Sequence, residues 1–168
     1  LEKQGFRRSE VQLVMASIYD TLGNTRAARS SLKAAVKSDV RNLDALHQLS
    51  LMQLAEGEPE DALEGLSRLI RQDPARFDAY LDRAEAYGQL GETEKAISDT
   101  DLYLTYFPED DGALYRKGLI QYNNGKYLNA IQSFNRALEL DNGRAEYYFA
   151  RGRTYATTGT YRYADRDM

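Results

Sequence analysis

The sequence predicts an all-α fold, a solenoid of antiparallel helix pairs, from observations that share one period. Glycines that follow amphipathic segments recur every 34 residues, and a small residue recurs five places after each glycine. A period of this length is typical of a repeat array in which each unit packs on the next. The glycines are Gly23, Gly57, Gly91, Gly125 and Gly159, and the small residues are Ala28, Ala62, Ala96, Ala130 and Ala164.

Residues 9–168 are predicted to form one domain of four complete units and a partial fifth. Each unit holds a first helix, a glycine turn and a second helix. Residues 1–8 show no clear period and are either a tail or the end of a preceding helix. Ser9-Glu10-Val11-Gln12 has capping-box spacing, which predicts that the first helix begins there. The units are 9–42, 43–76, 77–110, 111–144 and 145–168.

Prolines and small residues support this phase. Pro74 and Pro108 fall where a second helix should end, because proline cannot continue a helix. Pro59 falls in the first turn of a second helix, where its missing N–H costs nothing. In the fourth unit we expect Gly118 and Ala130 to let the two helices approach closely, with Phe134 in the core beyond them.

The composition is that of a folded, acidic protein. The 168 residues carry 22 Lys and Arg against 26 Asp and Glu, and this net charge of −4 argues against a nucleic-acid ligand. No cysteine is present, which excludes disulfides and thiol catalysis. No apolar run reaches the roughly 18–20 residues that cross a bilayer. Because the chain starts at Leu1 without a visible signal peptide, we expect a fragment whose N-terminus is missing, and both a cytoplasmic and an exported location stay open.

The repeat is similar to the tetratricopeptide repeat. That family has a 34-residue period and a motif in which an aromatic residue precedes Leu-Gly-x2-Tyr, followed by Ala-x3-Phe and a proline. The resemblance covers residues 9–168. It implies a right-handed superhelix whose first helices line a concave, protein-binding face. The matching residues are Tyr148-x2-Arg151-Gly152-x2-Tyr155, Ala130-x3-Phe134, and Pro74 or Pro108.

One departure from the family motif predicts ion pairs between the two helices of a unit. Where the family has leucine, the third and fifth units have Arg83 and Arg151, and an aspartate stands 16 residues after each. We expect the pairs Arg83–Asp99 and Arg151–Asp167. A partly exposed pair of this kind contributes up to about 1 kcal/mol, so its main effect would be on register.

A catalytic centre is hard to assemble from these residues. His47 is the only histidine, and there is no cysteine for it to activate. Glu109-Asp110-Asp111-Gly112 lacks the alternating ligand spacing of a calcium loop, and no glycine-rich phosphate loop occurs. We therefore predict a protein that is not an enzyme, with no catalytic residue, metal ligand, cofactor or small-molecule substrate.

The resemblance places the second, fifth, sixth, ninth, twelfth and thirteenth residues of each unit on the concave face. In the later units these positions, with Tyr122, combine apolar side chains and arginines, which predicts a groove for a peptide bearing apolar side chains and an acidic group. His47 falls on the same face, as a contact residue or plain surface. The alternative is that the apolar members pack against neighbouring helices. The predicted groove residues are Leu81, Glu85, Tyr115, Arg116, Leu119, Tyr122, Phe149, Arg153 and His47.

The carboxylate clamp of chaperone-binding relatives is missing. That clamp uses Lys, Asn, Asn, Lys and Arg at fixed places in three successive units. Binding of the acidic C-terminal tails of heat-shock chaperones is therefore not expected. The corresponding residues, counted from the first unit, are Leu13, Ser17, Gln48, Asp78 and Asp82.

Two further surfaces leave alternatives open. A basic stripe on the second helix of the first unit is either a contact for nucleic acid, anionic lipid or an acidic partner, or a solvated face. The chain also ends inside a second helix, so that Phe149 would lack its usual cover. The alternatives to a peptide groove are therefore a homodimer through the C-terminal end, or the repeat part of a larger multidomain protein. The stripe comprises Arg26, Arg29, Lys33, Lys37 and Arg41.

Overall fold

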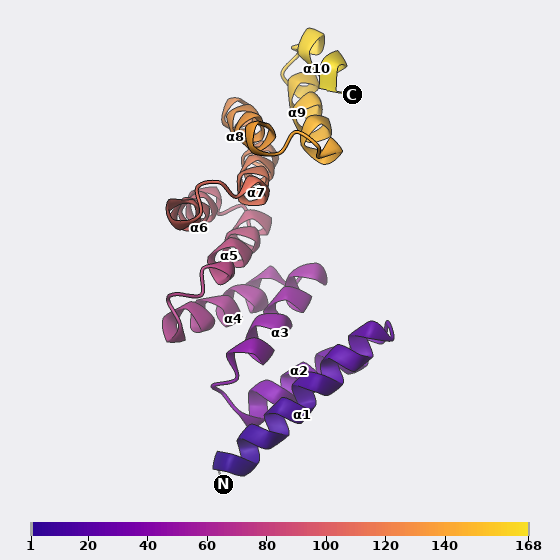
Figure 1. Cartoon of the computed structure of the whole chain (residues 1–168), viewed down its shortest axis with the longest axis vertical. Coiled ribbons are helices and arrows are strands. Elements are labelled where there is room, and N and C mark those ends of the chain that lie inside the picture. The colour runs from indigo at the N-terminus through magenta and orange to yellow at the C-terminus, as the bar shows by residue number, and fades with distance from the viewer. Residues whose placement is uncertain (1, 168) are drawn as a thin grey trace. The chain divides into compact units, whose positions relative to one another are not determined.

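The computed structural model describes residues 2–167, and every regular element in that range is a helix (Figure 1). The helices are joined by short turns, which confirms the predicted all-α repeat fold. None of them combines the length and the apolar character needed to cross a bilayer, as far as residues 2–167 are concerned. The ten helices are α1 (Glu2–Thr21), α2 (Thr25–Ser38), α3 (Leu43–Ala55), α4 (Pro59–Gln72), α5 (Asp78–Gln89), α6 (Thr93–Tyr106), α7 (Asp111–Asn123), α8 (Tyr127–Leu140), α9 (Ala145–Thr157) and α10 (Tyr161–Asp167).

The turns within the helix pairs lie at the predicted glycines. All five adopt φ between 70° and 76°, a left-handed conformation that glycine reaches without a steric penalty. Three first-turn amides are capped by side chains, since Asn24, Asn42 and Asp110 accept hydrogen bonds from the backbone N–H three residues later. Local residue chemistry therefore determines where the helices start and stop.

The first helix begins earlier than predicted. Helix α1 starts at Glu2, so residues 2–8 continue the same helix instead of forming a tail or a separate one. Ser9 is fully buried inside it. Its Oγ donates to the carbonyl of Ala35 at 2.9 Å and accepts from Nδ2 of Asn42 at 2.8 Å. The capping-box interpretation is wrong because this hydroxyl serves a contact between helices.

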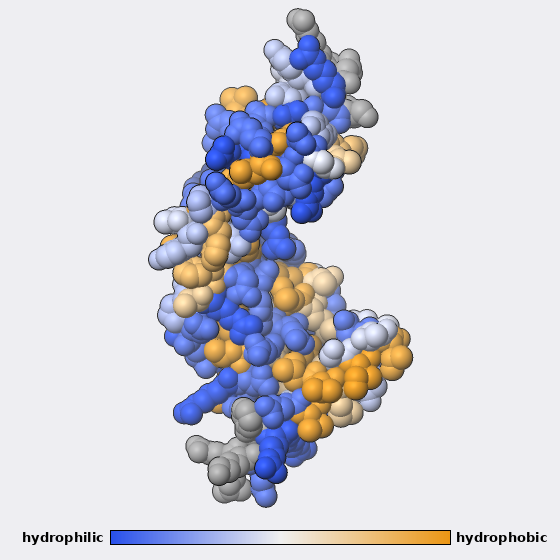
Figure 2. All heavy atoms as spheres, in the orientation of Figure 1, coloured by the Kyte–Doolittle hydropathy of each residue, from blue (hydrophilic) through white to orange (hydrophobic). Residues whose placement is uncertain are grey.

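The contacts divide the chain into two compact units, residues 1–79 and 80–168, which we call the N-terminal and C-terminal units and describe separately. The N-terminal unit has an aliphatic core, in which Ala16, Leu32 and Leu49 form one cluster. On the opposite side of α1, an apolar stripe is 53–72% exposed and appears as a hydrophobic band (Figure 2). The stripe consists of Val11, Val14, Ile18 and Leu22.

The C-terminal unit has a core with larger, aromatic side chains. Phe134 is fully buried and Tyr147 is 1% exposed. A Cβ atom placed on Gly118 would lie 2.7 Å from Cδ1 and 2.9 Å from Cζ of Phe134. The Phe134 ring therefore fills the space that glycine leaves at position 118, so the close approach predicted there depends on the absence of a side chain.

Both predicted ion pairs are confirmed in the C-terminal unit. Arg83 donates to the two carboxylate oxygens of Asp99 at 2.7 and 2.8 Å, and Arg151 donates to those of Asp167 at 2.6 and 2.7 Å. Because Asp99 accepts these hydrogen bonds, the pKa of Arg83 is raised. Lys117, at the same place in its unit, instead contacts Asp101 of the preceding helix at 2.6 Å.

Candidate partner-binding groove

A cavity of about 580 Å³ opens on the C-terminal unit. Its walls come mainly from α5, α7 and α9, the first helices of three successive repeats. Leu81 contributes from α5, Leu119 and Ile120 from α7, and Tyr147 from α9. The stacking of the repeats therefore brings apolar side chains from three first helices around one space.

Tyr115 forms the aromatic wall of this cavity. Its ring stacks on Tyr147, with centroids 4.6 Å apart, and lies 5.8 Å from Phe134. The Tyr147 hydroxyl donates to Asp111 at 2.6 Å. Burial raises the pKa of Tyr115, and burial together with the Asp111 hydrogen bond raises the pKa of Tyr147. The wall is therefore held by packing and by a hydrogen bond before any ligand arrives.

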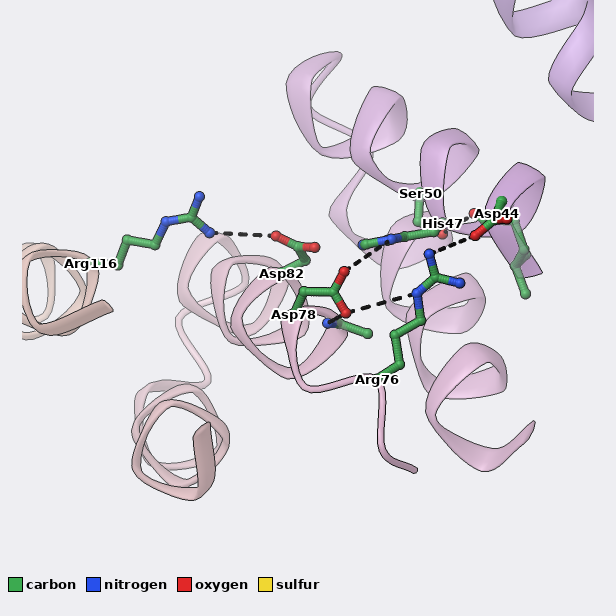
Figure 3. Close-up of polar contacts among 9 residues, drawn as sticks. Asp44, His47, Ser50, Arg76, Asp78, Asp82 and Arg116 are labelled. Carbon is green, nitrogen blue, oxygen red and sulfur yellow. Dashed lines mark hydrogen bonds and ion pairs between the residues drawn. The ribbon is translucent and has the colours of Figure 1, made fainter. Parts of the chain in front are cut away.

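The two arginines that line the cavity both have acidic partners. Nη1 of Arg116 lies 3.4 Å from Oδ1 of Asp82 (Figure 3). Nε of Arg144 donates a hydrogen bond to Asp141 at 3.2 Å, and this contact raises the pKa of Arg144. Arg144 also has two longer contacts, to Asp111 at 3.5 Å and to Glu146 at 3.6 Å.

Five of the nine predicted groove residues line this cavity, namely Leu81, Glu85, Tyr115, Arg116 and Leu119. Three others lie elsewhere in the C-terminal unit. The Arg153 guanidinium stacks on the Tyr122 ring, 4.5 Å from its centroid, and Phe149 is 58% exposed. The alternative, that the apolar groove residues pack against neighbouring helices, also holds in part. Tyr115, Leu119 and Tyr122 contact the core around Phe134.

His47 is not a surface residue of the groove. It lies on α3 in the N-terminal unit and is 8% exposed, with Nδ1 3.7 Å from Oδ2 of Asp78 (Figure 3). Arg76 points between Asp44 and Asp78, at 2.7 and 3.8 Å. The expectation of an exposed contact is wrong because residues 76–78, just before and at the start of α5, lie beside the imidazole.

Sequence reasoning missed several cavity residues, and their place in the repeat is the signal that could have found them. Gln89 and Asn123 occupy the thirteenth place of their units, and Glu146 the second place. The resemblance puts both places on the concave face. Arg144 and Tyr147 carry no comparable signal, because they precede the helix or belong to its buried side.

The N-terminal unit has a second cavity of about 460 Å³ with a different lining. It contains small and aliphatic residues such as Ala16, Leu51 and Met52, the acids Asp20 and Glu56, and no aromatic side chain. No basic side chain contributes to this lining either.

The basic stripe predicted on α2 is interrupted. Arg29 is half-buried and forms ion pairs with Glu56 and Glu58. The hydrogen bonds that Arg29 donates to Glu58 raise the pKa of Arg29. No three His, Asp or Glu side chains within the described residues come together as ligands for a metal ion.

Together, the paired helices and the groove along their first members define a helical-repeat protein. Models of the tetratricopeptide repeat match residues 13–74, 47–105 and 112–143. The chain belongs to the tetratricopeptide-repeat family.

Relatives of known name cover parts of the chain. It is 31% identical over 93 residues to the protein SGT1 homolog of Bos taurus, which is 55% of this chain and 28% of that protein. It is 28% identical over 86 residues to Hsp70-Hsp90 organizing protein 2 of Arabidopsis thaliana, 51% of this chain and 15% of that protein. The chain therefore spans less than a third of the length of these relatives.

Solved structures show the same fold over nearly the whole chain. MamA from Desulfovibrio magneticus RS-1 superimposes with a TM-score of 0.84 at 16% identity, covering 95% of this chain and 90% of the other. A tetratricopeptide-repeat protein from Parabacteroides merdae gives a TM-score of 0.79 at 26% identity, covering 96% and 64%.

Proposed function

We propose that the chain is a non-catalytic adaptor that holds a segment of a partner protein in the cavity of the C-terminal unit. The observation that carries this proposal is the cavity itself, about 580 Å³ in volume and lined by the first helices of three repeats. Such a concave surface with apolar side chains and a few polar groups is typical of binding sites.

The lining suits a polypeptide segment. Leu81, Leu119 and Tyr115 offer an apolar surface for one or two side chains of the segment. Gln89 and Asn123 each carry an amide that both donates and accepts, which matches the N–H and C=O groups of a peptide backbone. Because the aromatic wall is fixed beforehand, binding orders few protein side chains, and this lowers its entropic cost.

Relatives give further support to an adaptor role. One relative is named an organizing protein of Hsp70 and Hsp90, which describes a protein that works through other proteins. The clamp positions for acidic chaperone tails are filled differently in this chain, so the partner proposed for this groove is a different one.

The proposal is tested by capturing partners with the wild-type chain and with Leu119→Asp, followed by quantitative mass spectrometry. Leu119 lines the cavity, so a carboxylate there should reduce capture of the true partner about tenfold or more. Leu128→Asp is the matched control, because Leu128 is 75% exposed on α8 and does not line the cavity. Circular dichroism checks that both variants fold. Equal capture by Leu119→Asp and wild type would assign binding to another surface.

Self-association through the C-terminal end is a second candidate. Phe149 is 58% exposed and Tyr163 is 50% exposed, and both lie in the last helix pair. Exposed aromatic side chains are common at protein interfaces. Sedimentation velocity of the wild type and of Phe149→Glu tests it. A concentration-dependent dimer that Phe149→Glu abolishes supports the homodimer, and a monomer at all concentrations excludes it.

A further inference from the structure

We infer that the groove of the C-terminal unit selects a cationic segment, one in which a Lys or Arg side chain stands beside an apolar one. This inference rests on the proposed function, since it names the chemistry of the segment that the groove holds. It reverses the sequence-based expectation of an acidic ligand, which relied on Arg116 being available.

The first step is that Arg116 and Arg144 already have carboxylate partners within this unit. Arg116 contacts Asp82, whose side chain is only 12% exposed and is therefore poorly placed to pair with water instead. Arg144 has three carboxylates within 3.6 Å, those of Asp111, Asp141 and Glu146. An acidic ligand would have to compete with these carboxylates for the same guanidinium groups, and repulsion from them would oppose its entry.

The second step is that Glu85 has a free carboxylate. It lines the cavity from α5 and is exposed, and it forms no ion pair or side-chain hydrogen bond within residues 2–167. Leu81 and Gln89, one turn before and one turn after it on the same helix, line the cavity as well. A cationic group can therefore reach Glu85 from a segment that already contacts the apolar wall.

The third step is the balance of charge. The side chains that line the cavity and the carboxylates that contact its arginines comprise five carboxylates and two guanidinium groups. Arg153, whose charge acts on Tyr115, adds one more positive charge and leaves the balance negative. The field in the cavity is therefore negative and attracts cations. The acidic residues are Asp82, Glu85, Asp111, Asp141 and Glu146, and the basic residues are Arg116 and Arg144.

The fourth step is the shape of the ligand. Lys and Arg carry long aliphatic stems that pack on apolar surface while the charged end stays in water or meets a carboxylate. Tyr115 and Leu119 provide that surface, and Glu85 stands exposed where the charged end can meet it. A neighbouring Leu or Phe of the segment would fill the remaining apolar space against Leu81 and Ile120.

The experiment is a selection from a phage-displayed library of random dodecapeptides on four proteins: wild type, Leu119→Asp, Glu85→Lys and Glu109→Lys. Glu109 lies in the exposed turn between α6 and α7 and does not line the cavity, so Glu109→Lys is a matched control for the change of charge. We expect the wild type and Glu109→Lys to enrich peptides with Lys or Arg next to Leu or Phe. Glu85→Lys should lose this preference, and Leu119→Asp should enrich none of these peptides.

An enriched peptide, labelled with fluorescein, is then titrated by fluorescence anisotropy. Removing the charge in Glu85→Gln should weaken binding about 3- to 10-fold, and Glu109→Gln should change it less than about 2-fold. Binding should also weaken as salt is raised, because an exposed ion pair is screened.

The outcomes separate the two proposals. Peptides that are acidic or neutral, that still require Leu119 and that ignore Glu85 would overturn the cationic ligand and leave the groove in place. Peptides that bind equally well to Leu119→Asp, or no enrichment on the wild type over that variant, would overturn the proposed groove and the inference with it.

Discussion

The N-terminal and C-terminal units share one period but fill their cores differently. The place that holds Phe134 in the C-terminal unit holds Leu32 and Leu66 in the N-terminal unit, and all three side chains are at most 2% exposed. The small residue 16 positions before each of them changes in the opposite sense. It is Gly118 before Phe134, but Ala16 and Ser50 before the two leucines. Volume is conserved across these three pairs, but the equivalent pair Ala84–Thr100 of the C-terminal unit is smaller although both residues are buried.

The two units also differ in how the helices of a pair are fixed. Leu49 is buried in the aliphatic cluster of the N-terminal unit. The equivalent places of the C-terminal unit hold Arg83, Lys117 and Arg151, each of which is paired with an aspartate. An apolar contact, which has no preferred direction, is thus replaced by ion pairs, whose geometry is directional. The C-terminal unit, with its aromatic wall, is the part of the molecule where side-chain positions are most closely specified.

The largest expected effect comes from changing the volume at Gly118. Gly118→Ala would force its methyl group into the Phe134 ring and should lower the free energy of unfolding by about 1–3 kcal/mol. Phe134→Leu should cost a similar amount because it leaves a cavity. The double variant recreates the Ala16–Leu32 pair of the N-terminal unit, so it should cost at least about 1 kcal/mol less than the sum of the two single changes. Urea denaturation of all four proteins measures this coupling, and strict additivity would mean that the two residues do not share the space.

The ion pair between α5 and α6 should have the next largest effect. Asp99→Asn leaves Arg83 with a neutral partner, and since the two side chains are only 10% and 19% exposed, we expect a loss of about 1–3 kcal/mol. Replacing both members in Arg83→Leu/Asp99→Ala imitates the aliphatic contact of the N-terminal unit and should cost less than Asp99→Asn alone. Chemical denaturation measures the free energy of unfolding of both variants. If the double variant were less stable than Asp99→Asn, the ion pair would contribute net stability.

The smallest effect should appear at alkaline pH and depends on Tyr147, which occupies the place of Ala45 in the N-terminal unit. The fold raises the pKa of Tyr147 above its ordinary value near about 10, so the neutral phenol is the form that the folded state favours. The stabilisation that this preference provides is complete below about pH 10. It is lost as the pH rises from about 10 towards the higher pKa of the folded state. Tyr147→Phe removes the hydrogen bond to Asp111 and should cost about 1 kcal/mol near neutral pH.

The measurement for Tyr147 is the urea midpoint between about pH 8 and about pH 11. The wild type should lose stability more steeply over this range than Tyr147→Phe, so the two curves should converge. Tyr148→Phe, a change at the next residue of the same helix, is the control and should follow the wild type. Parallel curves for wild type and Tyr147→Phe would contradict the assignment.

Much of the fold could be predicted from the sequence because its signals are local. A glycine at φ near 75° ends a helix wherever it stands, and a proline marks a boundary for steric reasons. Even the pairs Arg83–Asp99 and Arg151–Asp167 were predictable, because two helices joined by a short turn bring residues 16 positions apart side by side.

Other features of the structure could not be predicted from local sequence patterns. Ser9 has a capping-box neighbourhood, but its hydroxyl is used between α1 and α2. Lys117 has a serine, Ser133, where Arg83 and Arg151 have an aspartate 16 residues later, and its partner Asp101 lies on the preceding helix. In both cases the competing partner is distant in the sequence, and only the packing of helices brings it close.

The sequence by itself determined the period, the turns and which helices line the groove, because backbone conformation follows from neighbouring residues. The tertiary structure decided which groove charges remain available. Asp82 and Arg116 stand 34 residues apart at the same place of successive repeats, and their contact gives the arginine an acidic partner. Glu85 has no such partner among residues 2–167. A long charged side chain pairs with an opposite charge that lies within a few ångströms. Which charges lie that close is determined only when the repeats pack.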